Sequence, residues 1–395
     1  MKVNIVARPD HSLKMYSDIM ELLDKNEELN LFTFYALRQG SLLNRLFPKL
    51  KVAPETSFTL DFYTIVTRLA NKVLRKVGAN VRENESFMFE LLAPKRTIQS
   101  CEVLHYWPFY CADMIKRIKK EKDLATVAEF YEAEPSYVNE LYATEYERYG
   151  LSFNRPINMM IDQNMAFSFE DNFIVASEFT RRSYAIKYPE KKYYVCKYGP
   201  AGYLLDDNAF REISKRRSAS VNNIVYVGQV CLEKGVHYLL DAVKGLNVDL
   251  HLIGPIREGQ ETVFNKLLAR TDNVKWHGAM RHTEVLNKLS EYDAFCLPSL
   301  ADNYSLAVVE ALSKGMPVIV TANCGNADDV QNFNLGMVTK VKDAASIREC
   351  IIKLKTTFDY VDFESGLRSF FSETNRNAYP QSVLNVYREL SRKSK

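Results

Sequence analysis

Short apolar runs alternate with longer amphipathic stretches along most of the chain, and this alternation limits the folds available to it. Such a pattern is typical of β-strand–α-helix units that assemble into parallel sheets. One series of predicted strands comprises Lys2–Ala7, Leu31–Ala36, Cys101–Tyr106, Leu124–Glu129, Asn172–Ala176 and Tyr193–Lys197. A second series comprises Asn223–Val227, Leu250–Ile253, Val274–Trp276, Ala294–Leu297, Val318–Thr321 and Gly336–Thr339. The sequence therefore predicts an α/β protein with two parallel sheets.

A polar, charged stretch separates the two series. The chain has 395 residues, which is more than a single hydrophobic core usually spans. We therefore predict a first domain over 1–205, a linker over 206–222 and a second domain over 223–370. A C-terminal helix over 371–395 is expected to pack back toward the first domain. Two α/β domains in tandem would bind substrates in the cleft between them, at the carboxyl ends of the strands.

The composition argues against several classes of protein. A net charge of +3 is too small for a nucleic-acid-binding surface. No run approaches 18 apolar residues, and the first residues lack the apolar core of a signal peptide, so neither a membrane-spanning helix nor a secretory leader is expected. Seven widely spaced cysteines without a CxxC pair argue against a disulfide framework or a zinc site, and they fit a reducing cytoplasm. Neither standard glycine-rich phosphate loop occurs.

The segment 298–317 carries the strongest chemical signal. A loop after a predicted strand carries Asp302, and a helix begins near Ser305 and Leu306 and carries Glu310. Free backbone N–H groups at the start of such a helix suit an anion such as a diphosphate. The two acids would hold hydroxyl groups of a bound sugar or ribose. The alternative is that Asp302 caps a solvent-exposed loop and that Glu310 is buried and paired.

The spacing of Asp302 and Glu310 resembles the E-x7-E signature of retaining glycosyltransferase family 4. Asp302 takes the place of the first Glu of that signature, and Glu310 matches the second. Further segments agree with the family in order and spacing: residues 227–235, which resemble its VGR…EKG loop, and residues 250–254 and 274–294. The first domain matches only in places.

The resemblance implies the GT-B fold, in which two Rossmann-like α/β domains face each other across a cleft. It also implies a cytoplasmic enzyme that moves a sugar from a nucleotide-sugar donor to an acceptor with retention of anomeric configuration, without a metal or another cofactor. The leaving phosphate is thought to take the acceptor proton in this family, so no carboxylate base is required. Lys234 would contact the donor diphosphate and offset its charge; the alternative is an exposed lysine in a turn.

The resemblance assigns further roles in the second domain. Glu310 would bind the ribose hydroxyls, and Asp302 would hold hydroxyls of the transferred sugar, next to backbone N–H groups of the loop and helix start. The other predicted substrate-binding positions in this domain are Gly228, Gln229, Asn303, Tyr304, Ser305 and Leu306.

Three departures from the family pattern affect the prediction. Gln229 stands where the family has an arginine, so one cation for the diphosphate is missing, because glutamine offers hydrogen bonds but no charge. Asp302 is one methylene shorter than glutamate, which would change the position or identity of the sugar. The first domain lacks the histidine that often follows one of its strands. Ala128 or Glu129 occupies that place, and Glu129 clusters with Glu132 and Glu134. We predict Glu129 as a catalytic residue that binds substrate hydroxyls; the alternative is a solvated acidic loop.

Two further features of the first domain have open interpretations. His105 closes a predicted strand and would face the cleft and touch the acceptor, or it is a buried structural histidine. Residues 62–78 form a basic amphipathic pattern that would contact an anionic membrane, or they form an ordinary surface helix. The six histidines show no metal-ligand spacing, so no metal site is expected.

The sequence thus predicts a retaining glycosyltransferase that acts on a glycan or lipid-linked acceptor, in the biosynthesis of a surface polysaccharide or glycoconjugate. It would act in the cytoplasm, and on the inner face of a membrane if residues 62–78 bind lipid. One alternative is a catalytically impaired GT-B-like protein that binds a nucleotide-sugar or a partner. A nucleotide-sugar epimerase or phosphorylase of the same architecture is disfavoured by the four matching segments.

Overall fold

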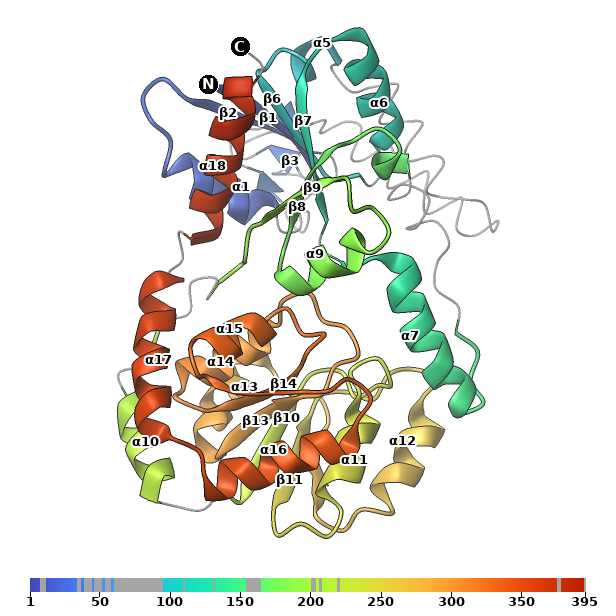
Figure 1. Cartoon of the computed structure of the whole chain (residues 1–395), viewed down its shortest axis with the longest axis vertical. Coiled ribbons are helices and arrows are strands. Elements are labelled where there is room, and N and C mark those ends of the chain that lie inside the picture. Colours follow the sequence, from blue (N-terminus) through green and yellow to red (C-terminus); the bar gives the residue numbers. More distant parts are fainter. Residues whose placement is uncertain are drawn as a thin grey trace.

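The computed structural model has two α/β domains, one above the other in Figure 1. It describes residues 1–7, 12–33, 37–38, 45, 52–53, 58–59, 95–108, 111–130, 132–153, 165–199, 204–205, 208–218, 221–374 and 378–393. Within these ranges every helix is too short or too polar for a transmembrane span.

The first domain is built on a seven-stranded parallel sheet with the strand order β5-β2-β1-β6-β7-β8-β9. Its strands are β1 (Lys2–Ala7), β2 (Glu28–Thr33), β5 (Phe58–Thr59), β6 (Val103–Tyr106), β7 (Ala125–Phe130), β8 (Asn172–Val175) and β9 (Lys192–Val195). The helices are α1 (Ser12–Met20), α5 (Lys95–Ile98), α6 (Ala112–Glu121), α7 (Pro135–Arg148) and α9 (Glu178–Ala185). A separate parallel pair consists of β3 (Leu37–Arg38) and β4 (Val52–Ala53).

The second domain is built on a six-stranded parallel sheet with the order β12-β11-β10-β13-β14-β15. Its strands are β10 (Asn223–Val227), β11 (Asp249–Ile253), β12 (Val274–Trp276), β13 (Ala294–Leu297), β14 (Val318–Thr321) and β15 (Gly336–Thr339). The helices are α10 (Ala209–Ser218), α11 (Val236–Val243), α12 (Glu261–Leu268), α13 (His282–Lys288), α14 (Leu306–Ser313), α15 (Ala327–Asn332), α16 (Ala344–Thr356) and α17 (Tyr360–Glu373), with a 3₁₀ turn η1 (Leu289–Glu291). The predicted α/β class with two parallel sheets is confirmed.

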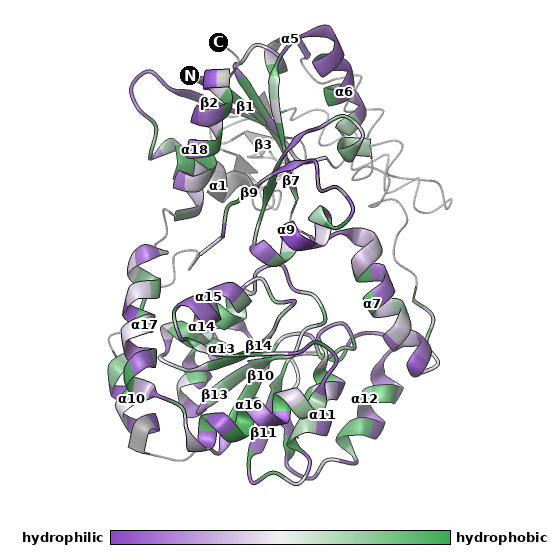
Figure 2. Ribbon diagram, in the orientation of Figure 1, coloured by the Kyte–Doolittle hydropathy of each residue, from purple (hydrophilic) through white to green (hydrophobic). Residues whose placement is uncertain are grey.

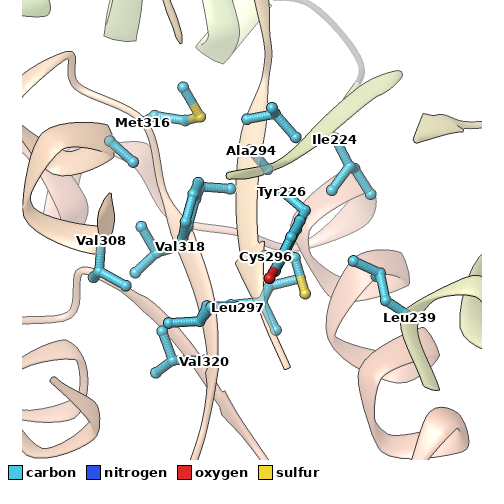
Figure 3. Close-up of a cluster of buried hydrophobic side chains, with 14 of the residues drawn as sticks. Ile224, Tyr226, Leu239, Ala294, Cys296, Leu297, Val308, Met316, Val318 and Val320 are labelled. Atoms are coloured by element: carbon cyan, nitrogen blue, oxygen red, sulfur yellow. The ribbon is translucent and has the colours of Figure 1, made fainter. Parts of the chain in front are cut away.

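Helices cover both faces of the second sheet, which explains why its inner strands β13 and β14 are continuous apolar runs. All residues of β13 and β14 are buried. Figure 3 shows side chains of these strands, such as Cys296 and Val318, packed with Ile224 of β10 and with Val308 of α14. Figure 2 shows the same arrangement as hydrophobic strands inside and hydrophilic residues on the outer helix faces.

The C-terminal helix α18 (Ala378–Lys393) leaves the second domain and packs on the first, beside α1, β6 and β7 (Figure 1). Val383 and Leu384 are fully buried in the core of the first domain. On its outer side, the Arg388 guanidinium donates to the carboxylates of Glu27 and Asp24. The two ends of the chain therefore form parts of one hydrophobic core.

The prediction of a linker over 206–222 is wrong for most of that stretch, because α10 occupies residues 209–218. Ile213 belongs to the core of the second domain. The neighbouring Arg216 is buried, and its guanidinium donates hydrogen bonds to the carbonyl oxygens of Tyr292 and Gly315. A run of charged residues resembles a solvated linker in sequence, but one of these cations satisfies backbone acceptors in the folded domain.

Helix α7 belongs to the first domain by chain order, yet its C-terminal end packs on the second domain (Figure 1). The buried Glu145 carboxylate lies 3.0 Å from His237 Nε2, accepts from the Tyr238 hydroxyl at 2.9 Å and pairs with Lys342 at 3.1 Å. Burial raises the pKa of Glu145, but these three hydrogen bonds outweigh it and lower the pKa to about 2. The helix is thereby fixed to the second domain by an ionised carboxylate.

Candidate donor-binding site

The predicted residues of the second domain meet at the carboxyl ends of β10 and β13, which are neighbours in the sheet. Lys234 lies in the loop after β10, and Asp302 lies in the loop after β13. The Lys234 ammonium donates to the Asp302 carboxylate over 2.5 Å, and both side chains are partly exposed. Burial lowers the pKa of Lys234, but the Asp302 carboxylate more than offsets this, so the pKa lies above its ordinary value. Lys234 is thus a permanent cation at this edge of the sheet.

The loop that carries Asp302 leads directly into α14, which begins at Leu306 as the sequence predicted. Of the backbone N–H groups from residue 303 to 306, that of Ser305 donates to the Asn326 side chain over 2.7 Å. The other three have no protein acceptor among the described residues. Leu306 is 43% exposed, so the start of the helix is open to solvent. Partial positive charge at such a terminus favours an anion.

Glu310 lies one turn further along α14 and is buried. Its Oε1 lies 2.9 Å from Nε2 of His282, whose side chain is 60% exposed. His282 is the first residue of α13, so the pair links the start of α13 to the second turn of α14. This arrangement presents a carboxylate and an imidazole that can both bond to hydroxyl groups of a ligand.

The side chains of Asn303 and Tyr304 form hydrogen bonds with other residues of the protein. The Asn303 Oδ1 accepts from Oγ1 of Thr180, a residue of α9 in the first domain, over 3.4 Å. Tyr304 is buried, and its hydroxyl donates to Asp329 over 3.0 Å. The Tyr304 side chain is therefore taken up by the fold, whereas Asn303 is partly exposed.

Further contacts from the first domain reach the loop after β14 and the helix α15 that follows it. The Tyr137 hydroxyl of α7 bonds to the Asn323 side chain, and Lys197 pairs with Asp329. Gly325 permits this approach, because a Cβ there would lie 1.7 Å from the Asn303 carbonyl oxygen and 2.8 Å from a first-domain hydroxyl. The carboxyl ends of both sheets thus meet around Asp302.

Gly228 and Gln229 begin the loop after β10. The Gly228 N–H donates to the carbonyl of Ile253, and its φ of 150° lies outside the range that other residues favour. The Gln229 side chain does not replace a cation, but it holds one: its Oε1 accepts from Arg257 over 2.7 and 2.9 Å. Arg257 follows β11, and its strand-end position is the sequence signal that could have identified it.

Glu129, predicted as a catalytic residue, lies in the interior of the first domain. Its carboxylate is 1% exposed and accepts from the Trp107 indole at 2.9 Å and from the Tyr379 hydroxyl of α18. The prediction that it binds substrate hydroxyls is not supported, because α18 covers the carboxyl end of β7. The alternative of a solvated acidic loop is wrong for the same reason.

His105, predicted to touch the acceptor, is also covered by α18. It has no exposed surface; its Nδ1 shares a hydrogen bond of 2.7 Å with the Tyr387 hydroxyl, and its Nε2 lies 3.1 Å from Glu129. The structural-histidine alternative therefore holds. Glu134 likewise serves the fold: it caps α7 by accepting from the Tyr137 N–H over 2.7 Å.

The amphipathic stretch 62–78 lies outside the described residues. The described ranges hold no cluster of three or more His, Cys, Asp or Glu side chains arranged to bind a metal ion.

Comparison with known sequences relates the second domain to one family. Residues 209–357 match the family model described as glycosyl transferases group 1. The chain is 26% identical over 167 residues, 42% of its length, to a 41.2 kDa protein of the cps region of Klebsiella pneumoniae. It is 27% identical over 159 residues, 38% of its length, to the capsular polysaccharide biosynthesis glycosyltransferase CapM of Staphylococcus aureus. The matches cover 46% and 41% of these relatives, so the chain spans less than half of the length of the curated relatives it matches.

Comparison with solved structures covers nearly the whole chain. The Anabaena protein Alr3699/HepE, solved in complex with UDP, superposes with a TM-score of 0.61 over 98% of this chain and 100% of that chain, at 14% identity. At this identity the likeness establishes the fold. The chain therefore has the two-domain GT-B fold, and its second domain resembles the group 1 glycosyl transferases.

Proposed function

We propose that the protein is a retaining glycosyltransferase that transfers a sugar from a nucleotide-sugar to a glycan or lipid-linked acceptor, in the biosynthesis of a surface polysaccharide or glycoconjugate. The single observation that carries this proposal is the convergence of Lys234, Asp302, Glu310 and the open start of α14 at one edge of the second sheet. The named activity of CapM and the match to group 1 glycosyl transferases support it.

In the proposed reaction, the start of α14 and the Lys234 ammonium bind the donor diphosphate. Lys234 exchanges its bond to Asp302 for one to phosphate, which frees the Asp302 carboxylate to accept from hydroxyls of the sugar. Glu310, with His282, holds the ribose hydroxyls. The bond from the anomeric carbon to the diphosphate oxygen breaks, the acceptor oxygen bonds to the same face of that carbon, and the acceptor proton passes to the diphosphate.

The reaction as proposed needs no metal, because Lys234 and the helix start offset the charge that develops on the leaving diphosphate. It takes place in the cytoplasm, where nucleotide-sugars are available. UDP-sugars are the first donors to test, since HepE was solved with UDP and with UDP-glucose.

The test is release of UDP, GDP or ADP from the corresponding nucleotide-sugars, measured by a coupled assay with and without a panel of glycan and polyprenyl-phosphate acceptors. The proposal expects one donor to be turned over by the parent protein, and turnover to fall by about 100- to 1,000-fold in Lys234→Met with folding retained. If the protein bound one nucleotide-sugar tightly but turned none over with any acceptor of the panel, it would be a nucleotide-sugar-binding protein rather than an enzyme. Absence of both would refute the proposal.

A further inference from the structure

Arg257 is a second cation at the edge of the sheet that carries Lys234. It lies four residues beyond the end of β11, the neighbour of β10. Its Nε and Nη2 donate to Gln229 Oε1 over 2.9 and 2.7 Å, and its Nη1 donates to Glu233. The guanidinium is thus attached to the same loop, 228–235, that ends in Lys234 and Gly235.

The backbone around Arg257 is fixed relative to that loop. The Val230 N–H donates to the Pro255 carbonyl over 2.9 Å, and the Arg257 N–H donates to the Val230 carbonyl over 3.0 Å. Gly254 has a φ of 144°, and a Cβ there would lie 1.9 Å from the Gly228 carbonyl oxygen. Only glycine permits this close approach of the two loops. Their packing therefore fixes the position of the Arg257 backbone.

The anchor of Arg257 is itself held from two sides. Glu233 is buried, and its carboxylate accepts from the Tyr146 hydroxyl of α7 over 2.7 Å and from Gln260 Nε2 over 3.2 Å. Burial and this carboxylate raise the pKa of Tyr146 to about 12, so the phenol stays a donor at neutral pH. A guanidinium that swung away would leave the buried Glu233 carboxylate without its cation, which disfavours such a movement.

The charge balance of the site calls for such a cation. A nucleoside diphosphate carries roughly two to three negative charges at neutral pH, since phosphate groups ionise near pH 6 and below. Lys234 already faces Asp302, and Glu310 adds a second carboxylate nearby. The bonds to Gln229 and Glu233 use three of the five N–H groups of Arg257, and its side chain is 37% exposed, so an anion can reach the remainder.

We propose that Arg257 is the second diphosphate-binding cation of the donor site, held in place by Gln229 and Glu233. This inference rests on the proposed function and adds a residue from a different loop. Gln229 is then a positioning residue, which explains why an uncharged side chain stands at the beginning of the phosphate loop. The guanidinium would bind a phosphate oxygen with its two remaining N–H groups.

The first test compares the affinities of UDP and uridine by isothermal titration calorimetry; GDP with guanosine and ADP with adenosine serve if another base is preferred. Arg257→Gln should weaken binding of the diphosphate by about tenfold to hundredfold, as for loss of a hydrogen bond to a charged group, and should leave nucleoside binding unchanged. The double variant Gln229→Arg/Arg257→Gln should recover most of the lost affinity. Arg270→Gln, which removes an exposed arginine just after α12, is the matched control.

The second test uses the parent protein, so it does not depend on the folding of a variant. Phenylglyoxal modifies exposed arginines, and mass spectrometry measures the extent of modification at each one. Saturating UDP should protect Arg257 and leave Arg270 unprotected, and uridine should protect neither. Equal UDP affinity in the parent and in Arg257→Gln, or full modification of Arg257 under saturating UDP, would overturn the inference. A parent that binds none of the three diphosphates would instead refute the proposed function.

Discussion

The carboxyl ends of the two sheets carry similar kinds of residues but differ in what covers them. After β10 and β13, Lys234 and Asp302 lie partly exposed, and first-domain contacts such as that of Thr180 with Asn303 leave them uncovered. At β6 and β7 of the first sheet, His105 and Glu129 lie beneath α18 with no more than 1% of their surface exposed. A polar residue at the end of a parallel strand is therefore a candidate ligand group only where no later element covers it. Substitutions at Lys234, Glu129 and Glu310 test this difference, and a substitution at Glu145 tests the helix that joins the two regions.

The largest effect is expected at Lys234. Lys234→Met removes the cation that would offset charge on the leaving diphosphate, and turnover should fall by about 100- to 1,000-fold, as for loss of one group that stabilises a charged transition state. Initial rates with the preferred nucleotide-sugar measure this loss. Lys275→Met, which removes a lysine that is 60% exposed on β12, should leave the rate within about twofold. If Lys234→Met kept the parental rate, the assignment of Lys234 to the donor site would be wrong.

The second prediction concerns Glu129, which lies beneath α18. Glu129→Gln replaces an acceptor of two buried donors with a side chain that can accept from only one, so the free energy of unfolding should fall by about 2–3 kcal/mol. Urea unfolding measures it, with Glu364→Gln on the exposed face of α17 as the control. Affinity for nucleotide should be unchanged. If stability were retained and turnover lost, Glu129 would be a catalytic residue after all.

The third prediction concerns α7, which joins the two regions. The pKa of Glu145 is about 2 in the folded protein against an ordinary value of 4.5, so its contribution to stability is complete above pH 4.5 and is lost as the pH falls toward 2. Urea unfolding from pH 5 to pH 3 should therefore show a steeper loss of stability in the parent than in Glu145→Gln. Glu147→Gln, on the exposed side of the same helix, should retain the parental slope. Parallel slopes in all three proteins would contradict the assigned pKa.

The smallest effect is expected at Glu310. Glu310→Gln keeps the shape of the side chain but weakens a hydrogen bond to a ribose hydroxyl, which corresponds to about fivefold in affinity. The parent should bind UDP more tightly than 2′-deoxy-UDP, and the variant should lose that preference. Glu291→Gln, beside Lys288 on the surface, is the control. If Glu310→Gln still preferred UDP over 2′-deoxy-UDP as strongly as the parent does, another residue would bind the ribose hydroxyls.

Most of the fold could be predicted because short apolar strands that alternate with amphipathic helices leave a clear local pattern. The predicted bounds of β1, β10, β12, β13, β14 and β15 agree with the structure. The start of β2 is Glu28 rather than Leu31, because pairing with β1 draws in polar residues that the apolar pattern does not mark. Helix α10 was missed since its charged residues resemble a linker.

The candidate site could be predicted only where its residues lie within one local motif. The spacing from Asp302 to Glu310 can be read along a single loop and helix. Arg257 meets Gln229 across two loops, and Tyr379 meets Glu129 across 250 residues of sequence. The position of Arg257 just after β11 marks it as a candidate in the sequence, but the contacts themselves depend on how distant elements pack, and no local pattern records those.

Hydrogen–deuterium exchange with and without saturating UDP tests the central claim most directly, because it reports on both sheet edges in one experiment. If the second domain binds the donor, exchange should slow in residues 228–235, 254–257 and 302–310. Residues 125–130 of β7 should exchange at the same rate in both states. Protection at β7 with none in the three segments of the second domain would contradict the account.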